Sequence, residues 1–415
     1  MTRTQSSLFS PILIAGCLIL MLGFAIRASF GIFQIPIAEE FGWLRSEFSL
    51  AIAIQNLAWG VGQPIFAAFA EKFGDRKAIA LGALTYALGL VLSSFAVSPL
   101  EHQLLEILVG FGIAGTGFGV ILAVIGRAVS DENRSMALGI ATALGSAGQV
   151  VGPPFADYLL QSMNWSSVFL IFAGIILIVL LILPFMKSDA PIASKEVSDE
   201  SMGQVLRKAF YDPTYIMIFV GFFSCGFQLG FFTAHFPAYI AEACAAIPVD
   251  SIMRSIGVSS TTALGAFAFA LIGVANIVGT IIAGALGKHY SKKYLLTYIY
   301  IGRTVASALF ILSPMTPTTV VLFSVVMGTL WLATVPITSG LVAQIYGVKY
   351  MGTLYGIVFF SHQLGSFLGV WLGGTLYDQC GTYDLVWWVG IGVGAFSAII
   401  HLPVKEQPYD ERQAA

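Results

Sequence analysis

An arginine inside an apolar segment is the first residue of this sequence whose chemistry needs an explanation. Arg27 interrupts the run from about residue 12 to 35, where a permanent charge is costly unless it faces water or a partner. By their spacing, Gly23, Arg27, Gly31 and Gln34 share one small, polar helix face, as in a cavity wall. A guanidinium binds carboxylates through a planar fork of donors, which favours a small organic anion as ligand. The alternative is pairing with helix C-terminal carbonyls or snorkelling.

A second apolar segment repeats this pattern. Aligning Pro36 with Pro237 pairs Gly23, Arg27 and Gln34 with Ser224, Gln228 and His235. The second three also share one helix face. Two polar stripes at matching positions are consistent with inheritance from one ancestral helix.

Other polar residues within apolar segments are further candidates for contact with a ligand. They are Asn56, which shares a face with Gly60 and Gln63, and Gln228, Asn276, Trp331, His362 and Gln363. Each can serve either as a ligand contact or as a hydrogen bond between helices.

Few groups in these segments can bind and release a proton near neutral pH. The candidates are Asp157, Glu106, His235 and His362. His362 lies nearest the centre of its segment, so a proton-coupled mechanism assigns the relay to it. A structural role for this histidine is the alternative.

The composition shows which elements must position these side chains. The chain has 415 residues, of which 57% are hydrophobic and 10% charged, against about 25% charged in soluble domains. Apolar runs of about 20 residues, each long enough to cross a bilayer, recur twelve times. The predicted spans are 12–35, 47–70, 78–97, 103–126, 135–160, 165–186, 214–240, 262–287, 294–313, 318–345, 351–377 and 384–403. The sequence predicts an all-α polytopic membrane protein.

The placement of cations gives the orientation. The net charge of −2 gives no reason to expect a nucleic-acid partner, but sixteen of the twenty Lys and Arg fall on one side of the twelve spans. Arg45 and Arg254 fall on the other side, and Arg27 and Arg303 lie within spans. By the positive-inside rule, both termini are cytoplasmic. We read the first span as a retained helix, because no clear cleavage site follows it.

An internal repeat divides the chain into two halves of six helices. Residues 187–213 form the longest polar stretch, which separates an N-terminal bundle (1–186) from a C-terminal bundle (214–415). Glycines recur at a constant offset of 217, since Gly139, Gly148 and Gly152 match Gly356, Gly365 and Gly369. Duplicated bundles keep small packing residues at equal positions.

The loop after the second span carries a family resemblance. The stretch 67–77, with Glu71, Gly74, Arg76 and Lys77, resembles the major facilitator signature Gly-x-x-x-Asp-Arg-x-Gly-x-Arg-Arg/Lys. Ala67, Glu71 and Lys72 depart from it conservatively. The resemblance implies a fold of two pseudo-symmetric six-helix halves, in which Glu71, Arg76 and Lys77 latch the cytoplasmic helix ends in the outward-open state. The simpler alternative is that these charges only satisfy the positive-inside rule.

A second phrase narrows the resemblance. Residues 41–47, Phe-Gly-Trp-Leu-Arg-Ser-Glu, are similar to the start of helix 2 in bacterial relatives of the monocarboxylate transporters and oxalate/formate exchangers. A simple helix start, with Ser46 as cap, also explains this phrase. Monocarboxylate transporters typically carry an arginine in helix 8, whereas this chain has Asn276 near that place. Recognition of an anion would then fall mostly to Arg27.

The fifth span carries a third pattern. Gly139, Gly148, Gly152 and Pro153 resemble the helix 5 motif of antiporters, with Ala156 and Asp157 in place of its terminal glycines. Small residues at this spacing also let a neighbouring helix approach closely in any mode of transport. Both readings stay open.

These observations lead to one functional hypothesis and two alternatives. We expect alternating-access transport of a small, monocarboxylate-like anion with a proton as coupling ion, by a monomer in the bilayer of a bacterial inner membrane. The alternatives are proton-coupled efflux of drugs or metabolites, and a non-transporting membrane receptor.

The sequence gives no reason to expect an enzyme. It shows no phosphate-binding loop, no ligand cluster for a metal and no nucleophile elbow, so we expect no catalytic residue, metal or cofactor. Cys244 and Cys380 fall in predicted external loops, where free thiols are favoured over a disulfide.

Overall fold

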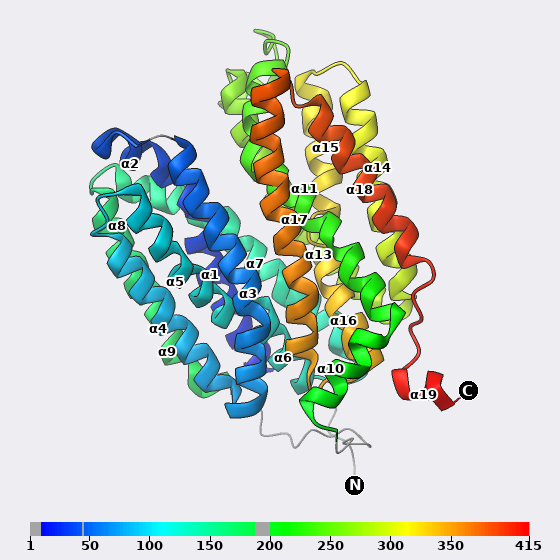
Figure 1. Cartoon of the computed structure of the whole chain (residues 1–415). Coiled ribbons are helices and arrows are strands. Elements are labelled where there is room, and N and C mark those ends of the chain that lie inside the picture. Colours follow the sequence, from blue (N-terminus) through cyan, green and yellow to red (C-terminus); the bar gives the residue numbers. More distant parts are fainter. Residues whose placement is uncertain (1–9, 44, 187–199, 415) are drawn as a thin grey trace.

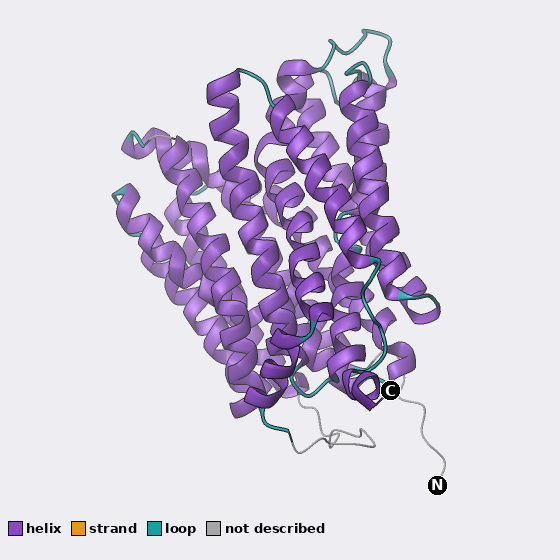
Figure 2. Ribbon diagram, turned by 45° about the vertical axis from the view of Figure 1, so that its right-hand side comes forward, coloured by secondary structure: helices purple, strands orange, loops and turns teal. Residues whose placement is uncertain are grey.

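The structure is a computed structural model that describes residues 10–43, 45–186 and 200–414, and in this part every regular element is a helix (Figure 2). The first half contains α1 (Pro11–Ser29), η1 (Phe30–Phe33), α2 (Gln34–Phe41), α3 (Arg45–Phe73), α4 (Asp75–Ser93), α5 (Pro99–Thr116), α6 (Phe118–Ala128), α7 (Asp131–Leu160), α8 (Trp165–Leu177), α9 (Val179–Ile182) and η2 (Leu183–Met186). The second half contains α11 (Pro213–Ala243), α12 (Ile252–Ser255), α13 (Thr261–His289), α14 (Lys292–Leu312), α15 (Pro317–Leu330), α16 (Thr334–Tyr346), α17 (Met351–Cys380) and α18 (Asp384–His401).

Eleven stretches of the described chain are long and apolar enough to cross a membrane. They agree with eleven of the twelve predicted spans to within a few residues. The predicted second span is α3, which has 29 residues and carries Gln55, Asn56 and Gln63 among its apolar side chains. Because α3 runs along both α5 and α17, we count it as the twelfth crossing.

Two short helices lie outside the crossings. Helix α10 (Met202–Tyr211) occupies part of the predicted polar linker, and a capping box between Ser201 and Gln204 begins it. Residues 187–199 of that linker lie outside the described part. Helix α19 (Tyr409–Ala414) is held by an ion pair of 2.6 Å between Arg412 and Asp212.

Two predicted spans are broken where the sequence suggested continuous helices. The span 103–126 is split at Gly117 into α5 and α6, and the span 318–345 is split at residues 331–333 into α15 and α16. A Cβ at Gly117 would lie 2.6 Å from the carbonyl oxygen of Ile113. The breaks lie at corresponding places of the two halves. Interrupted helices in this arrangement mark binding sites in duplicated membrane transporters.

Side chains satisfy the backbone groups that the breaks release. At the first break, Gln63 Nε2 donates to the carbonyl of Ala114 at 3.3 Å. At the second, the backbone N–H of Leu332 donates to Asn276 Oδ1 at 2.9 Å, and Arg303 Nη1 donates to the carbonyl of Trp331 at 3.4 Å. Unpaired backbone groups are costly at membrane depth, so these polar residues stabilise the broken helices.

The glycine motif of α7 packs that helix against α1. A Cβ at Gly148 would lie 2.2 Å from the carbonyl oxygen of Met21, and one at Gly152 would lie 2.0 Å from that of Ala25. Pro153 follows inside α7, and the helix continues to Leu160. Close approach of the two backbones therefore requires these glycines.

The equivalent glycines of α17 make the equivalent contacts with α11. A Cβ at Gly365 would lie 2.2 Å from the carbonyl oxygen of Phe223, and one at Gly369 would lie 2.1 Å from that of Phe227. Pairs of helices at matching places in the two halves thus use the same packing. This agreement supports the internal repeat read from the sequence.

The two halves meet through α3 with α17 and through α7 with α13. Gly139 approaches Gly284 of α13, and Gly356 approaches Pro64 of α3. Both contacts lie toward the end of the molecule at which α3 ends and α17 begins, which we call the closed end. Figure 1 shows α3 and α17 diverging away from this end.

We predict that Gly148→Ala lowers the melting temperature of the purified protein by several degrees, since the added methyl group meets the α1 backbone and overpacking costs about 1–3 kcal/mol. Thermal unfolding in detergent measures this. Gly174→Ala is the matched control, because a Cβ there meets nothing within 4 Å. Equal stability of both variants would contradict the packing argument.

Candidate functional site

Arg27 lies in the last turn of α1 and is the cation of the candidate site. Its Nη2 donates to Asn56 Oδ1 on α3 at 2.7 Å, and its guanidinium lies 4.8 Å from the ring centre of Trp59. Both partners are neutral, and among the ion pairs of the described residues none includes Arg27. The side chain is half-buried, and its Nε has no hydrogen-bond partner. Arg27 therefore carries a positive charge that no carboxylate contacts.

A polar chain continues from Asn56 across the interface between the halves. Gln363 Nε2 of α17 donates to the backbone carbonyl of Asn56 at 3.3 Å, and Gln363 Oε1 lies 3.1 Å from His362 Nδ1. The direction of that last hydrogen bond depends on the histidine tautomer. The structure thus brings together four of the seven predicted ligand contacts, namely Arg27, Asn56, His362 and Gln363.

An aromatic layer surrounds this chain. The ring of Trp59 lies 4.9 Å from that of Phe359, which stacks on His362 at 5.0 Å and an interplanar angle of 11°. Phe24 and Phe118 extend the layer within the first half. Such walls exclude water and strengthen the attraction between a guanidinium and an anion.

The first helix break adjoins the same site. Trp59 Nε1 donates to Gln63 Oε1 at 2.6 Å, and Gln63 is the side chain that satisfies the carbonyl of Ala114 below Gly117. The tryptophan that covers Arg27 is therefore fixed by the interrupted helix.

The remaining three predicted contacts lie elsewhere. Gln228 is buried and donates to the carbonyl of Gly390 on α18 at 3.0 Å. Asn276 Nδ2 donates to Ser146 Oγ at 2.8 Å, and Asn276 Oδ1 accepts from the backbone N–H of Leu332 at the second break. Trp331 stacks on Phe232 beside that break. These contacts are interhelical, which is one of the two roles that the sequence left open.

The helix-face argument for α1 and α11 is matched in part by the structure. Gly31 is exposed, whereas the side chain of Gln34 lies outside the described part. Ser224 is buried, and Gln228 faces α18 rather than the interface between the halves. Gln228, the equivalent of Arg27 in the second half, therefore does not contribute to the site around Arg27.

The proton-coupling candidates lie in four different environments. Asp157 is exposed, with Gln161 Nε2 at 3.4 Å, and His235 Nε2 lies 2.9 Å from the carbonyl of Val370. His362 belongs to the polar chain described above. Glu106 is fully buried on α5 and accepts a hydrogen bond of 2.6 Å from Gln55.

Arg303, the other arginine within a span, has a structural partner. It is fully buried on α14, and its Nη1 contacts the carbonyl of Trp331 at the C-terminal end of α15. A cation stabilises the negative end of a helix dipole. We therefore assign Arg303 to the second helix break and not to the site of Arg27.

The loop with the family signature lies at the closed end. Both carboxylate oxygens of Glu71 accept hydrogen bonds from Thr353 of α17, one from its backbone N–H at 3.1 Å and one from its hydroxyl. Arg76 donates to the carbonyl of Pro184 at 2.6 Å, and Lys77 is exposed. Gly74 has φ of +105°, which favours glycine at this turn. Of these residues, Glu71 contacts the opposite half.

The second pair of helices meets in the same way at the closed end. Lys288 of α13 forms an ion pair of 2.9 Å with Glu132 of α7, and Ser135 Oγ donates to the carbonyl of Gly287 at 3.1 Å. Hydrogen bonds on both sides thus hold the two halves together at this end.

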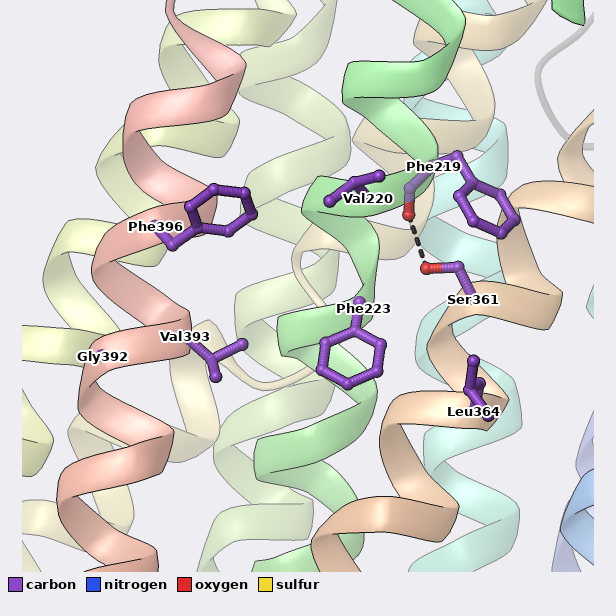
Figure 3. A pocket seen from close by; sticks show the side chains of 8 residues that line it. All are labelled: Phe219, Val220, Phe223, Ser361, Leu364, Gly392, Val393 and Phe396. Atoms are coloured by element: carbon purple, nitrogen blue, oxygen red, sulfur yellow. Dashed lines mark hydrogen bonds between the residues drawn. The ribbon is translucent and has the colours of Figure 1, made fainter.

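A separate cavity lies away from this site. It measures about 370 Å³ and is lined by residues of α11, α17 and α18 (Figure 3). Its hydroxyl, that of Ser361, already donates to the carbonyl of Phe219 at 2.5 Å. The other lining side chains are apolar, so nothing in this cavity recognises a charged ligand.

The four cysteines are free thiols. Cys17, Cys225 and Cys244 are buried, whereas Cys380 is exposed. Cys244 and Cys380 do not form a disulfide in this structure, which leaves both as thiols, as the sequence favoured.

Two site residues escaped the sequence analysis. Trp59 follows Asn56 by three positions and therefore shares its helix face, so this spacing could have indicated Trp59 as a site residue. Gln55 precedes Asn56 and points to Glu106, and no pattern in the sequence indicates that contact.

The fold and the site define a membrane-embedded transporter: twelve crossings in two similar halves, closed at one end, with a cation between them that has only neutral contacts. The Major Facilitator Superfamily model matches residues 15–245 and 231–415, and the chain belongs to this family. Its members are transporters of small molecules and not enzymes.

Relatives and a solved structure agree with this assignment. The chain is 26% identical to the uncharacterized MFS-type transporter YcxA of Bacillus subtilis, over 94% of this chain and 92% of YcxA. It is 25% identical to monocarboxylate transporter 12 of Mus musculus, over 92% and 83% of the two chains. The E. coli fucose:proton symporter FucP superposes with a TM-score of 0.67 at 15% identity, over 94% and 98%. The last match shows the shared fold.

We predict that Glu71→Gln loosens the closed end, because an amide offers one acceptor oxygen where the carboxylate offers two. Spin labels at Lys77→Cys and Lys405→Cys, in a Cys380→Ser background, report the separation of the halves there. We expect a larger population at long distances. The control is Asp131→Asn, whose carboxylate pairs with Arg134 within its own helix. An unchanged distance distribution in Glu71→Gln would count against the latch.

Proposed function

We propose that this protein carries a small organic anion, of the monocarboxylate type, across the membrane by alternating access, with a proton as the coupling ion. The observation that carries the proposal is Arg27, a cation between the two halves whose partners are a neutral amide and an indole ring. A carboxylate would supply the missing negative charge and accept two N–H bonds.

The groups that line the site support a small ligand. Asn56 and Gln363 offer amide groups beside the guanidinium, and Trp59 and Phe359 form an apolar wall. A short carboxylate with a small organic group fits a site with one charge, two amides and aromatic walls. A lipophilic cation, as in drug efflux, would be repelled by Arg27.

A relative points to the same ligand class. Monocarboxylate transporter 12 of the mouse is named for monocarboxylates, and the likeness covers most of both chains. The substrate class proposed here therefore rests on Arg27 and on this likeness together.

In this proposal, alternating access requires the contacts between the two halves to break and form again. The closed end is held by Glu71 with Thr353 and by Lys288 with Glu132, and these contacts must break when the site opens there. We propose that the closed end is cytoplasmic, because the cations of the sequence gather on that side. The structure then corresponds to an outward-facing state.

The arrangement in the cell follows the same rule. We propose a multi-pass protein of the bacterial inner membrane with both termini in the cytoplasm. The two moving units are residues 1–186 and 214–415, joined by the cytoplasmic segment 187–213. All proposed ligand contacts come from one chain, so a monomer suffices for transport.

We predict that Arg27→Gln reduces uptake of labelled lactate and pyruvate by at least tenfold, since loss of a charge-assisted hydrogen bond costs about 1.5–3 kcal/mol. Arg27→Lys, which keeps the charge but loses the fork, should retain part of the activity. The assay uses proteoliposomes with an imposed pH gradient. Arg207→Gln is the control, because Arg207 is exposed on α10.

Two results would overturn this proposal. Wild-type protein that carries neither acid would contradict the substrate class, while leaving the family assignment intact. Normal uptake by Arg27→Gln would contradict the site.

A further inference from the structure

A buried carboxyl lies behind the candidate site, in the first half. Glu106 of α5 is fully buried, and Gln55 Nε2 donates to its Oε2 at 2.6 Å. Its Oε1 has no hydrogen-bond partner and lies 3.8 Å from His102 Nε2, which is also unpartnered. Among the ion pairs of the described residues, none joins Glu106 to a lysine or arginine.

The surroundings of this carboxyl are apolar. The ring of His102 stacks on Phe48 at 5.3 Å and on Phe169 at 6.3 Å, and Trp43 lies 5.8 Å away. An ionised carboxylate is costly in such a place unless a cation balances it. Glu106 is therefore a neutral acid in this state, or it depends on a positive charge nearby.

Helix α3 connects Glu106 to Arg27, the cation of the candidate site. Gln55 and Asn56 are consecutive residues of α3. Gln55 donates a hydrogen bond to Glu106, and Asn56 accepts one from Arg27. Tyr86 of α4 donates its hydroxyl to the carbonyl of Gly23 in α1, the helix that carries Arg27, at 3.3 Å. Any displacement of α3 therefore affects the acid and the cation together.

We propose that Glu106 is the group that carries the coupling proton. This inference rests on the proposed function. When the anion occupies Arg27, Glu106 is protonated, so the cation and the anion balance. When the site is empty, the Glu106 carboxylate balances Arg27. The buried site is then neutral in both of the states that reorient, which low-dielectric surroundings favour.

The proton step involves no redox chemistry. A proton from water on the open side bonds to a carboxylate oxygen of Glu106, and the anion binds Arg27. After reorientation the anion leaves, the O–H bond breaks, and the proton passes to water on the other side. One anion and one proton move in each cycle.

The charge balance separates Glu106 from the other candidates. The group that replaces the anion must be negative when the site is empty, and a histidine such as His362 or His235 cannot be. Asp157 is exposed to solvent. The other buried carboxylate among the described residues, Asp212, is paired with Arg412.

The groups that face Glu106 are few in the described structure. They are His102 on its own helix, Tyr86 and Ser93 on α4, and the amide of Gln55 on α3. His102 is the one rival that could hold the proton in place of Glu106.

The test uses Glu106→Gln, a permanently neutral substitute, in proteoliposomes with labelled lactate. We expect uptake driven by a pH gradient to fall at least tenfold, because the empty site cannot return without its negative charge. Exchange of internal for external lactate should stay within about threefold of wild type, because the loaded site reorients in both directions. Asp157→Asn is the matched control and should keep both activities.

Further variants make each result decisive. Glu106→Asp should regain gradient-driven uptake. Wild-type gradient-driven uptake in Glu106→Gln would overturn the assignment, as would loss of exchange together with net uptake. Loss of gradient-driven uptake in His102→Gln but not in Glu106→Gln would move the proton to His102. Uptake by the wild-type protein is measured before that of any variant. If the wild-type protein carries neither lactate nor pyruvate, the proposed function itself fails.

Discussion

The structure depends on a positive charge that is held between two helical bundles without a carboxylate in contact with it. Arg27 lies at membrane depth, where an uncompensated charge is among the costliest features a helix can carry. The contacts around it reduce this cost but do not cancel it, since Asn56 offers an amide oxygen and Trp59 the face of its ring. A site of this kind is completed by an anion, and we propose that transport exploits this requirement.

The internal repeat explains how the charge is positioned. Matching glycines bring α7 onto α1 and α17 onto α11, and matching breaks interrupt the fourth and tenth crossings. The halves then diverge in their polar residues. The first places Arg27, Trp59 and Gln63 around its break, whereas the second places Arg303 and Asn276 around its own. One duplicated scaffold thus holds a half-buried cation beside the interface in one half and a fully buried structural cation in the other.

Hydropathy and cation placement were sufficient to predict the crossings, because a membrane imposes a length on every apolar segment. Polarity at depth also selected Arg27 and Asn56 as candidates, but it did not predict the hydrogen bond between them. The breaks at Gly117 and at residues 331–333 were not predicted, because both stretches remain apolar throughout and the side chains that satisfy them come from other helices. The direction of Gln228 toward α18 could not be predicted either, since helical spacing defines a face but not the neighbour that it meets.

The central claim is that the buried site is neutral both when loaded and when empty, with one proton accompanying one anion. The most direct test is lactate uptake into proteoliposomes at a fixed pH gradient, while potassium and valinomycin set the membrane potential. The account predicts the same rate at 0 mV and at roughly ±100 mV, because no net charge crosses the membrane. A rate that rises or falls with the potential would contradict it, since the reorienting site would then carry a charge.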